Sequence, residues 1–311
     1  MSRYLITGVA GFIGSNLAEA LLASGDTVRG LDDFSSGRRE NLDGLDGLEF
    51  VEGDIRDLQT CRAACSEVEF VLHQAALGSV PRSVADPITS NAANVTGTLN
   101  MLVAARDAGV RRLVFAASSS AYGDTPTLPK VETMPARPLS PYAISKYAGE
   151  EYCRTFTALY GFETVALRYF NVFGRRQDPH STYAAVIPKF VSALLKGQPP
   201  EIHGDGEQTR DFTYIANVVQ ANRNACHAPA EACGEVYNVA CGERISLNVL
   251  YRHIAGLLGS NIEPHHGPPR PGDVRDSLAD IDKACRLLGY RPTHTVEQGL
   301  AEAMEWYREN L

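Results

Sequence analysis

Short apolar runs alternate with amphipathic stretches through the first half of the chain. The runs that resemble buried strands cover residues 4–6, 27–28, 50–51, 70–72, 113–115 and 165–167. Helical patterns lie between several of them, over residues 16–23, 94–108 and 142–160. Strands that alternate with helices of this length indicate a parallel sheet covered on both faces. The pattern therefore predicts an α/β fold with a doubly wound parallel sheet.

The regular alternation ends near residue 170. Prolines then cluster at Pro199 and Pro200 and again at residues 268–271, which indicates loops, and residues 281–311 resemble two short helices. A chain of 311 residues is long enough for two domains of about 150 residues each. We expect a Rossmann-type nucleotide-binding domain over residues 1–170 and a smaller C-terminal α/β substrate lobe over residues 171–311. We also expect some of the chain to cross back between the two.

The charge balance narrows the class of partner. With 29 Lys and Arg against 37 Asp and Glu, the net charge is −8, which argues against binding to nucleic acid or to an anionic membrane. No stretch approaches the ~20 consecutive apolar residues of a membrane span. The seven cysteines are scattered, and neither they nor the histidines have metal-ligand spacing. The first residues run directly into a strand pattern without a signal peptide. We expect reduced thiols, no metal and a cytoplasmic protein.

A glycine-rich turn follows the first predicted strand. Gly8, Gly11 and Gly14 have the spacing G-x-x-G-x-x-G and lead into the first predicted helix. Such a turn lets the backbone approach a pyrophosphate closely, and the helix N-terminus then presents its N–H groups to the anion. This context predicts a dinucleotide site.

An acidic residue stands where such a site needs one. Asp32 ends the second predicted strand, 18 residues after Gly14, where a carboxylate accepts the ribose hydroxyls of NAD and repels the 2′-phosphate of NADP. Arg38 and Arg39 could instead receive that phosphate. On the strength of Asp32 we predict NAD.

A tyrosine and a lysine give the second chemical signal. Tyr142 and Lys146 are four residues apart in a predicted helix, so their side chains share one face. A nearby ammonium stabilises a phenolate and lowers the pKa of the phenol, which would make Tyr142 a general base. Ser118 ends an upstream strand, and ligands of doubly wound sheets bind at the carboxyl ends of strands. Its hydroxyl is expected beside Tyr142, so Ser118, Tyr142 and Lys146 form the candidate catalytic set.

With these residues in place, the sequence resembles the extended short-chain dehydrogenase/reductase superfamily. Within it the sequence is most similar to NAD-dependent nucleotide-sugar epimerases, specifically bacterial UDP-N-acetylglucosamine and UDP-glucose 4-epimerases. The resemblance covers essentially the whole chain. Further segments that carry it are residues 73–76, 78–83, 168–179, 183–189, 204–211 and 272–275.

The resemblance implies a reaction and a set of cofactor-binding residues. Tyr142 would take the proton of the sugar 4-hydroxyl while a hydride passes from C4 to tightly bound NAD, and the 4-keto sugar would then turn and take the hydride back on its other face. The implied NAD-binding residues are Gly8, Gly11, Phe12, Ile13, Gly14, Asp32, Asp33, Ser35, Ser36, Gly37, Asp54, Ile55, Gln74, Ala75, Ala76, Asn94, Tyr142, Lys146 and Phe170.

The resemblance also implies how a UDP-sugar is held. Arg210 and Arg270 would receive the pyrophosphate, since its oxygens suit forked cationic donors. Ser277 would line the sugar pocket, where a small side chain leaves room for an acetamido group at C2. The complete implied substrate set is Ser79, Arg82, Ser118, Ser119, Ser120, Tyr142, Asn171, Ala185, Val186, Arg210, Arg270, Asp273 and Ser277. Relatives of this kind form homodimers through two helices, here residues 94–108 and 142–160.

Three alternatives remain beside a UDP-hexose 4-epimerase. Dehydratase and decarboxylase relatives carry acidic residues directly after the strand-end hydroxyl, where this chain has Ser119 and Ser120, so elimination is disfavoured. Epimerisation of a UDP-uronic acid or a UDP-pentose would use the same core residues. A non-catalytic NAD-binding protein on the same fold is the third alternative, although it would be expected to lose Tyr142 or Lys146.

Overall fold

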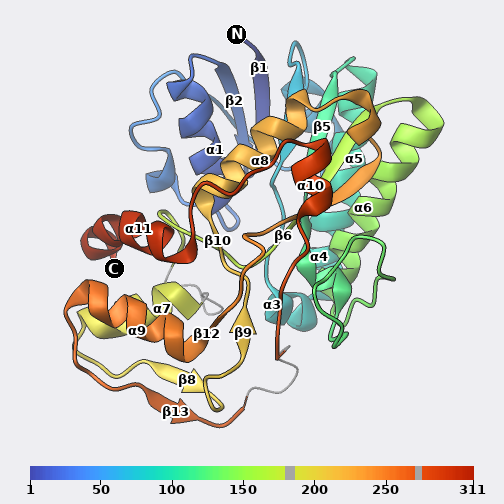
Figure 1. Ribbon diagram of the computed structural model, residues 1–311. Helices are drawn as coiled ribbons and strands as arrows, with labels where there is room; N and C mark the ends of the chain where they lie inside the picture. The colour runs from blue at the N-terminus through green and yellow to red at the C-terminus, as the bar shows by residue number, and fades with distance from the viewer. Residues whose placement is uncertain (179–185, 270–274) are drawn as a thin grey trace.

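The computed structural model describes residues 1–178, 186–269 and 275–311, and its centre is a parallel β-sheet (Figure 1). The seven strands follow the order β11-β6-β5-β4-β1-β2-β3, and each neighbouring pair is parallel. They are β1 (Arg3–Thr7), β2 (Thr27–Asp32), β3 (Glu49–Glu52), β4 (Phe70–His73), β5 (Arg112–Ser118), β6 (Glu163–Tyr169) and β11 (Glu235–Val239). Each of the six predicted strand runs lies within one of them. The predicted doubly wound parallel sheet is confirmed.

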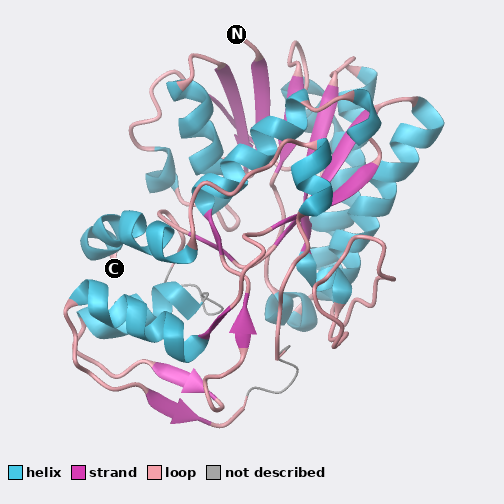
Figure 2. Ribbon diagram, in the orientation of Figure 1, coloured by secondary structure: helices cyan, strands magenta, loops and turns pink. Residues whose placement is uncertain are grey.

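Helices cover both faces of the sheet (Figure 2). One face carries α1 (Phe12–Ala23) and α8 (Ile215–His227), and the other carries α2 (Leu58–Ala64), α5 (Gly97–Asp107) and α6 (Pro141–Tyr160). Successive side chains of a strand point to opposite faces. In β1, Tyr4 and Ile6 therefore pack in the core beneath α1, and Leu5 packs in the core beneath α5. The near-continuous apolar runs of the sequence reflect this burial on two sides.

Shorter helical segments link the strands of the main sheet. They are η1 (Arg39–Leu42), α3 (Val80–Ala85), α4 (Pro87–Asn91), the π-helical η2 (Ala92–Thr96), η3 (Ser119–Tyr122) and η4 (Ala230–Ala232). A segment with π-helical hydrogen bonds interrupts the helix that runs from α4 into α5. Such segments occur frequently at functional sites.

A second group of elements lies at the lower left of Figure 1, beyond the carboxyl ends of the strands. Its helices are α7 (Val186–Leu195), α9 (Leu247–Leu258) and α11 (Val296–Asn310), and α10 (Asp282–Leu287) packs against β11. Two-stranded pairs join β7 (Val172–Phe173) to β10 (Thr213–Tyr214), β9 (Thr209–Arg210) to β12 (Ile245–Ser246) and β8 (Glu201–His203) to β13 (His265–Gly267). The two short helices expected over residues 281–311 are α10 and α11.

The chain after residue 170 contributes to both groups. It builds the lobe around α7 and α9, and it also returns to the sheet, where α8 packs on α1 and β11 pairs with β6. A division into residues 1–170 and 171–311 remains a prediction.

The strand order reverses between β1 and β4, because the chain winds outward from β1 in one direction and from β4 in the other. The loops after these two strands therefore leave toward opposite faces and open a crevice at their carboxyl ends. Ligands of open α/β sheets bind in such a crevice.

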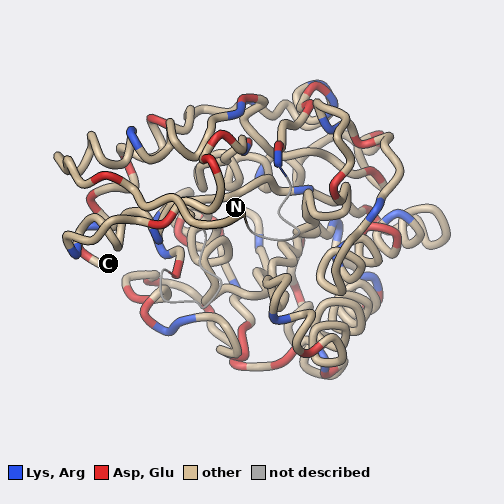
Figure 3. Tube along the Cα trace, turned by 90° about the horizontal axis from the view of Figure 1, so that it is seen from below, with Lys and Arg blue, Asp and Glu red and all other residues tan. Residues whose placement is uncertain are grey.

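No helix of the described residues is long and apolar enough to cross a membrane. Lys and Arg residues are interspersed with Asp and Glu residues along the trace (Figure 3). All seven cysteines are free thiols.

A fully buried histidine at the end of β4 makes stability depend on pH. His73 Nδ1 lies 2.7 Å from Thr7 Oγ1, and Nε2 lies 3.0 Å from Thr98 Oγ1. Burial, and secondarily the charge of Lys146, lowers the pKa of His73 to about 3. The unfolded chain, with a histidine pKa near 6.5, binds this proton more readily than the folded chain does. The stability that neutral His73 contributes is therefore fully present above about pH 6.5, and it is lost progressively as the pH drops toward 3.

We predict that the free energy of unfolding decreases between pH 7 and pH 5 by about 2 kcal/mol more in wild type than in His73→Gln. Urea denaturation at a series of pH values measures both. The exposed His266, changed to Gln, is the matched control and should retain the wild-type slope. Parallel stability curves for wild type and His73→Gln would contradict this account.

Candidate active site

The loop after β1 requires glycine at two positions. Gly8 has a φ of +70°, and a Cβ there would lie 2.8 Å from the backbone of Ala75, in the loop after β4. A Cβ on Gly14 would lie 2.1 Å from the carbonyl oxygen of Gly8. Neither contact is possible for a larger residue. The glycines thus let the β1 loop pass close both to the β4 loop and to the start of α1.

The start of α1 provides an anion site. The helix begins at Phe12, and its N-cap, Gly11, has no side chain to accept the first N–H groups. The first N–H groups of a helix have no partner within the helix and carry the positive end of its dipole. The Cβ-free cradle and these donors together fit the pyrophosphate of a dinucleotide.

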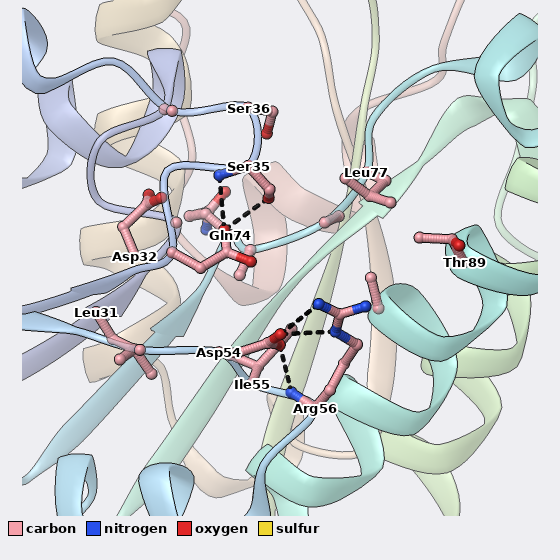
Figure 4. Close-up of a pocket in the computed structure, with 18 residues that line it drawn as sticks. Leu31, Asp32, Ser35, Ser36, Asp54, Ile55, Arg56, Gln74, Leu77 and Thr89 are labelled. Carbon is pink, nitrogen blue, oxygen red and sulfur yellow. Dashed lines mark hydrogen bonds and ion pairs between the residues drawn. The ribbon is translucent and has the colours of Figure 1, made fainter.

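One pocket extends from the glycine loop past the end of β2 (Figure 4). In Asp32, Oδ2 accepts the N–H of Ala10 at 2.9 Å and Oδ1 accepts that of Phe34 at 2.8 Å. Burial raises the pKa of Asp32, and these hydrogen bonds oppose the shift. The NAD-binding candidates that line this pocket are Gly8, Gly11, Asp32, Asp33, Ser35, Ser36, Gly37, Asp54, Ile55, Gln74, Ala75 and Ala76.

The two arginines that could have favoured NADP both form ion pairs. Arg39 pairs with Glu52 at 2.8 Å, and its guanidinium lies 3.8 Å from the centroid of the Phe34 ring. Arg38 lies 3.5 Å from Glu40 and 3.7 Å from Asp178. The Asp32 carboxylate at the end of β2 fits an unphosphorylated ribose.

A second pocket brings the glycine loop together with α6. Tyr142 and Lys146 line it with Phe12, Ile13 and Gly14. Ser79 and Arg82, both substrate-binding candidates, line it as well. The residues that the sequence analysis chose from separate segments thus meet at the carboxyl edge of the sheet.

Ser118 ends β5 next to this pocket. Its hydroxyl is hydrogen-bonded to Tyr142 and accepts the backbone N–H of Ser120 at 3.2 Å. The Ser120 hydroxyl donates to Ser118 Oγ at 2.9 Å. Ser119 and Ser120 begin η3, so the serine run leaves the strand directly at the site.

The electrostatic state of Tyr142 differs from the expectation. Burial raises the pKa of Tyr142 above its usual value, and the hydrogen bond with Ser118 opposes the shift. The predicted net lowering is therefore wrong, because burial dominates; the Lys146 ammonium donates to the carbonyl oxygen of Ala116 at 2.8 Å. Burial lowers the pKa of Lys146 to about 8.

Two NAD-binding candidates do not line either pocket. Asn94 is buried: its Oδ1 accepts the N–H of Leu77, and its Nδ2 donates to Ser145 Oγ at 3.0 Å. Phe170 is buried in a small cluster with Tyr122.

A third cavity lies in the lobe, and three substrate-binding candidates line it: Asn171, Val186 and Arg210. Asn171 has a φ of +33°, in the left-handed region that asparagine tolerates better than most residues. Its Nδ2 donates to the carbonyl oxygen of Asp211 at 2.9 Å and to Ser277 Oγ at 3.3 Å. Ser277 thus lies at the edge of the residues that bound this cavity.

Asp211 holds this part of the lobe together. Its carboxylate accepts the backbone N–H groups of Cys241, Gly242 and Ala279, and its own N–H donates to Ser277 Oγ at 3.2 Å. The remaining candidates Ala185, Arg270 and Asp273 lie outside the described residues.

The sequence analysis missed several residues that line the first two pockets. Arg56 pairs with Asp54, and Tyr169 ends β6, a position that the strand-end rule could have indicated. Arg176 comes from the loop after β7, and no local pattern marks it. The other lining residues that had not been named are Leu31, Asn41, Gly53, Leu77, Gly78, Thr89, Ala93, Ala116, Ala117 and Asp178, and Arg38, considered above for NADP, also lines the second pocket.

Comparison with known proteins gives one consistent family. Residues 4–240 match the model of the NAD dependent epimerase/dehydratase family. A UDP-glucose 4-epimerase of Mycolicibacterium smegmatis is 44% identical over 98% of both chains. A UDP-glucuronate 4-epimerase of Thermodesulfobacterium geofontis is 34% identical over 100% of this chain and 98% of the relative.

A solved structure agrees with the sequence relatives. The UDP-N-acetylglucosamine 4-epimerase of Methanobrevibacter ruminantium, in complex with UDP-N-acetylmuramic acid, superposes with a TM-score of 0.95. It is 38% identical and covers 100% of this chain and 99% of its own. The protein described here belongs to the NAD dependent epimerase/dehydratase family and is an enzyme that uses NAD.

Proposed function

We propose that this enzyme is a UDP-sugar 4-epimerase that interconverts UDP-GlcNAc with UDP-GalNAc and also UDP-Glc with UDP-Gal. The observation that carries the proposal is the meeting of Tyr142, Lys146 and the glycine loop in one pocket, with Ser118 hydrogen-bonded to Tyr142. An acid/base group beside a dinucleotide site suits the oxidation of an alcohol to a ketone.

The proposed reaction begins at the sugar 4-hydroxyl. Ser118 and Tyr142 hold this hydroxyl, and Tyr142 takes its proton while the C4 hydrogen leaves as a hydride. NAD, when bound, supplies the acceptor of that hydride and later its donor. Tyr142 then returns the proton to the 4-keto sugar after the ketone has presented its other face. Substrate and product have the same oxidation state, so no external oxidant is consumed.

The protonation of Tyr142 sets a requirement on the site. Because burial raises the pKa of Tyr142, the phenol releases its proton only with help from positive charge nearby. The Lys146 ammonium is one such charge, and NAD bound in its oxidised form would supply another. The proposed role of Lys146 is therefore electrostatic as well as ribose binding.

Ser277 supports the breadth of the proposed substrate range. Its hydroxyl is held by Asn171 and Asp211, so the side chain is fixed close to the residues that bound the lobe cavity. A short side chain here leaves space for an acetamido group, whereas a bulky one would fill it. A UDP-uronic acid is the second candidate substrate, because one relative is a UDP-glucuronate 4-epimerase.

We propose a homodimer built on α5 and α6. Several large apolar side chains on and beside α6 are exposed in the monomer, among them Ile144, Leu159, Tyr160 and, on α4, Ile88. Exposed apolar side chains on neighbouring helices are typical of a protein interface.

The proposed cytoplasmic location remains a prediction.

We predict that Tyr142→Phe lowers kcat for UDP-sugar epimerisation by about two to four orders of magnitude, because the acid/base group is lost. NAD content and the unfolding midpoint should stay at wild-type values. Proton NMR of the anomeric region measures the rate, and absorbance after denaturation measures NAD. Tyr147→Phe, on the same helix but outside the pocket, is the matched control. Near wild-type turnover by Tyr142→Phe would rule out this role.

We predict that Ser277→Tyr suppresses turnover of UDP-GlcNAc at least about tenfold more than turnover of UDP-Glc. A steric clash with the acetamido group would lower the transition-state stabilisation of UDP-GlcNAc alone, by about 1.4 kcal/mol or more. The ratio of the two kcat/KM values measures the effect, and UDP-Glc serves as the internal control. An equal loss on both substrates would separate Ser277 from sugar specificity.

A further inference from the structure

A third ionisable residue lies on the inner face of α6. Glu150 follows Lys146 by four residues, just as Lys146 follows Tyr142, so all three side chains share one side of the helix. Glu150 is 5% exposed. The proposed reaction uses Tyr142 and Lys146 and leaves Glu150 without a part.

Glu150 forms a buried ion pair with Arg168 of β6. Arg168 Nε donates to Glu150 Oε1 at 3.0 Å, and Nη2 donates to Oε2 at 2.7 Å, so the carboxylate is held by two parallel hydrogen bonds. For the side-chain atoms alone, the exposed fraction is 4% in both residues. The guanidinium lies 4.5 Å from the centroid of the Tyr122 ring, and Tyr122 in turn donates to Asn238. The carboxylate therefore has a fixed orientation.

Stability gives a poor reason for this pair. Removing two charges from water costs more than a well-packed apolar pair of the same volume would, unless every donor is satisfied. Here Arg168 Nη1 is buried and has no hydrogen-bond partner in the part of the chain that the structure describes. The pair can therefore have a benefit other than stability.

That benefit is found one helical turn away, at Lys146. Its ammonium is buried, donates to the carbonyl oxygen of Ala116 and lies 5.0 Å from the centroid of the Phe115 ring. An ammonium in such surroundings loses its proton more easily than in water. Burial indeed lowers the pKa of Lys146, and the Glu150 carboxylate is the largest influence that opposes this shift.

Other titratable groups around Lys146 do not provide this negative charge. His73 of β4 is neutral, because burial holds its pKa far below 7. Burial also raises the pKa of Cys153, on the same helix, so that its thiol stays protonated. Tyr142 is a phenol at rest. Arg168, the neighbour from β6, is positive and paired with Glu150.

We propose that Glu150 is a positioning residue of the reaction, whose carboxylate, oriented by Arg168, keeps Lys146 in its ammonium form within the pocket. Without this carboxylate, Lys146 would be neutral in a larger fraction of the enzyme molecules at physiological pH. In those molecules it could no longer stabilise the Tyr142 phenolate. The catalytic meaning rests on the proposed function, but the effect on Lys146 can be measured without any turnover.

The direct experiment is an NMR titration of the NAD-bound enzyme with lysine labelled by ¹³C at Cε. The sequence has only five lysines, at positions 130, 146, 189, 196 and 283, and the Lys146→Met spectrum identifies the signal of Lys146. The chemical shift of that signal against pH gives the pKa of Lys146 in each variant.

Two changes at the pair keep the protein foldable. Glu150→Asp retains the ion pair but withdraws the carboxylate by one methylene. The double variant Glu150→Leu with Arg168→Met removes both charges, so no buried charge is left alone. Glu151→Gln is the matched control, since Glu151 is on the same helix and pairs with Arg154 at the surface.

We expect the double variant to lower the pKa of Lys146 by about half a unit or more, since the loss of the positive Arg168 offsets part of the loss of the carboxylate. Glu150→Asp should shift it in the same direction, and Glu151→Gln should leave it unchanged. The alkaline limb of the kcat profile should move to lower pH by a similar amount, with KM unaltered. A folded double variant with a wild-type Lys146 titration would overturn the proposal. A shifted titration in an enzyme that turns over no UDP-sugar would refute the proposed function and leave the inference about Glu150 standing.

Discussion

The site depends on the close passage of two loops at the point where the strand order reverses. Gly8 after β1 and Ala75 after β4 lie so near each other that a single Cβ would separate them. The crevice between the two loops takes its shape from this contact, and α1 begins beside it without a side-chain cap. Asp32 from β2 and Tyr142 from α6 then reach the crevice from opposite sides. A larger residue at position 8 would disturb all of these at once.

Charge is distributed unevenly around this crevice. The chain as a whole carries −8, yet Arg38, Arg82, Lys146 and Arg176 all line the pocket next to the glycine loop. Such a local concentration of cations is what an acidic protein needs to hold two pyrophosphate-bearing ligands. The buried cation among these, Lys146, donates to a backbone carbonyl oxygen at short range. The pocket can therefore be positive without burying a free charge.

Local patterns predicted the sheet, the glycine loop and the set of Ser118, Tyr142 and Lys146, because they follow from strand and helix periodicity, glycine spacing and the rule that ligands bind at strand ends. Asn94 shows where such patterns fail. It lies in the π-helical segment η2, and its side-chain amide is hydrogen-bonded to the backbone of Leu77 and to Ser145. No rule of residue spacing predicts these two contacts. The pKa of Tyr142 was misjudged for a similar reason. The i, i+4 spacing reveals the ammonium but neither the burial of the phenol nor the Ala116 carbonyl that receives Lys146.

In the proposed epimerisation, the hydrogen at C4 leaves and returns within one site. The most direct test is to incubate the purified enzyme, without added NAD, with UDP-GlcNAc that carries deuterium at C4, and to follow the anomeric and C4 positions by NMR. We expect UDP-GalNAc to appear with its deuterium retained at C4. Loss of the label to solvent, or no epimer even after NAD is added, would contradict it.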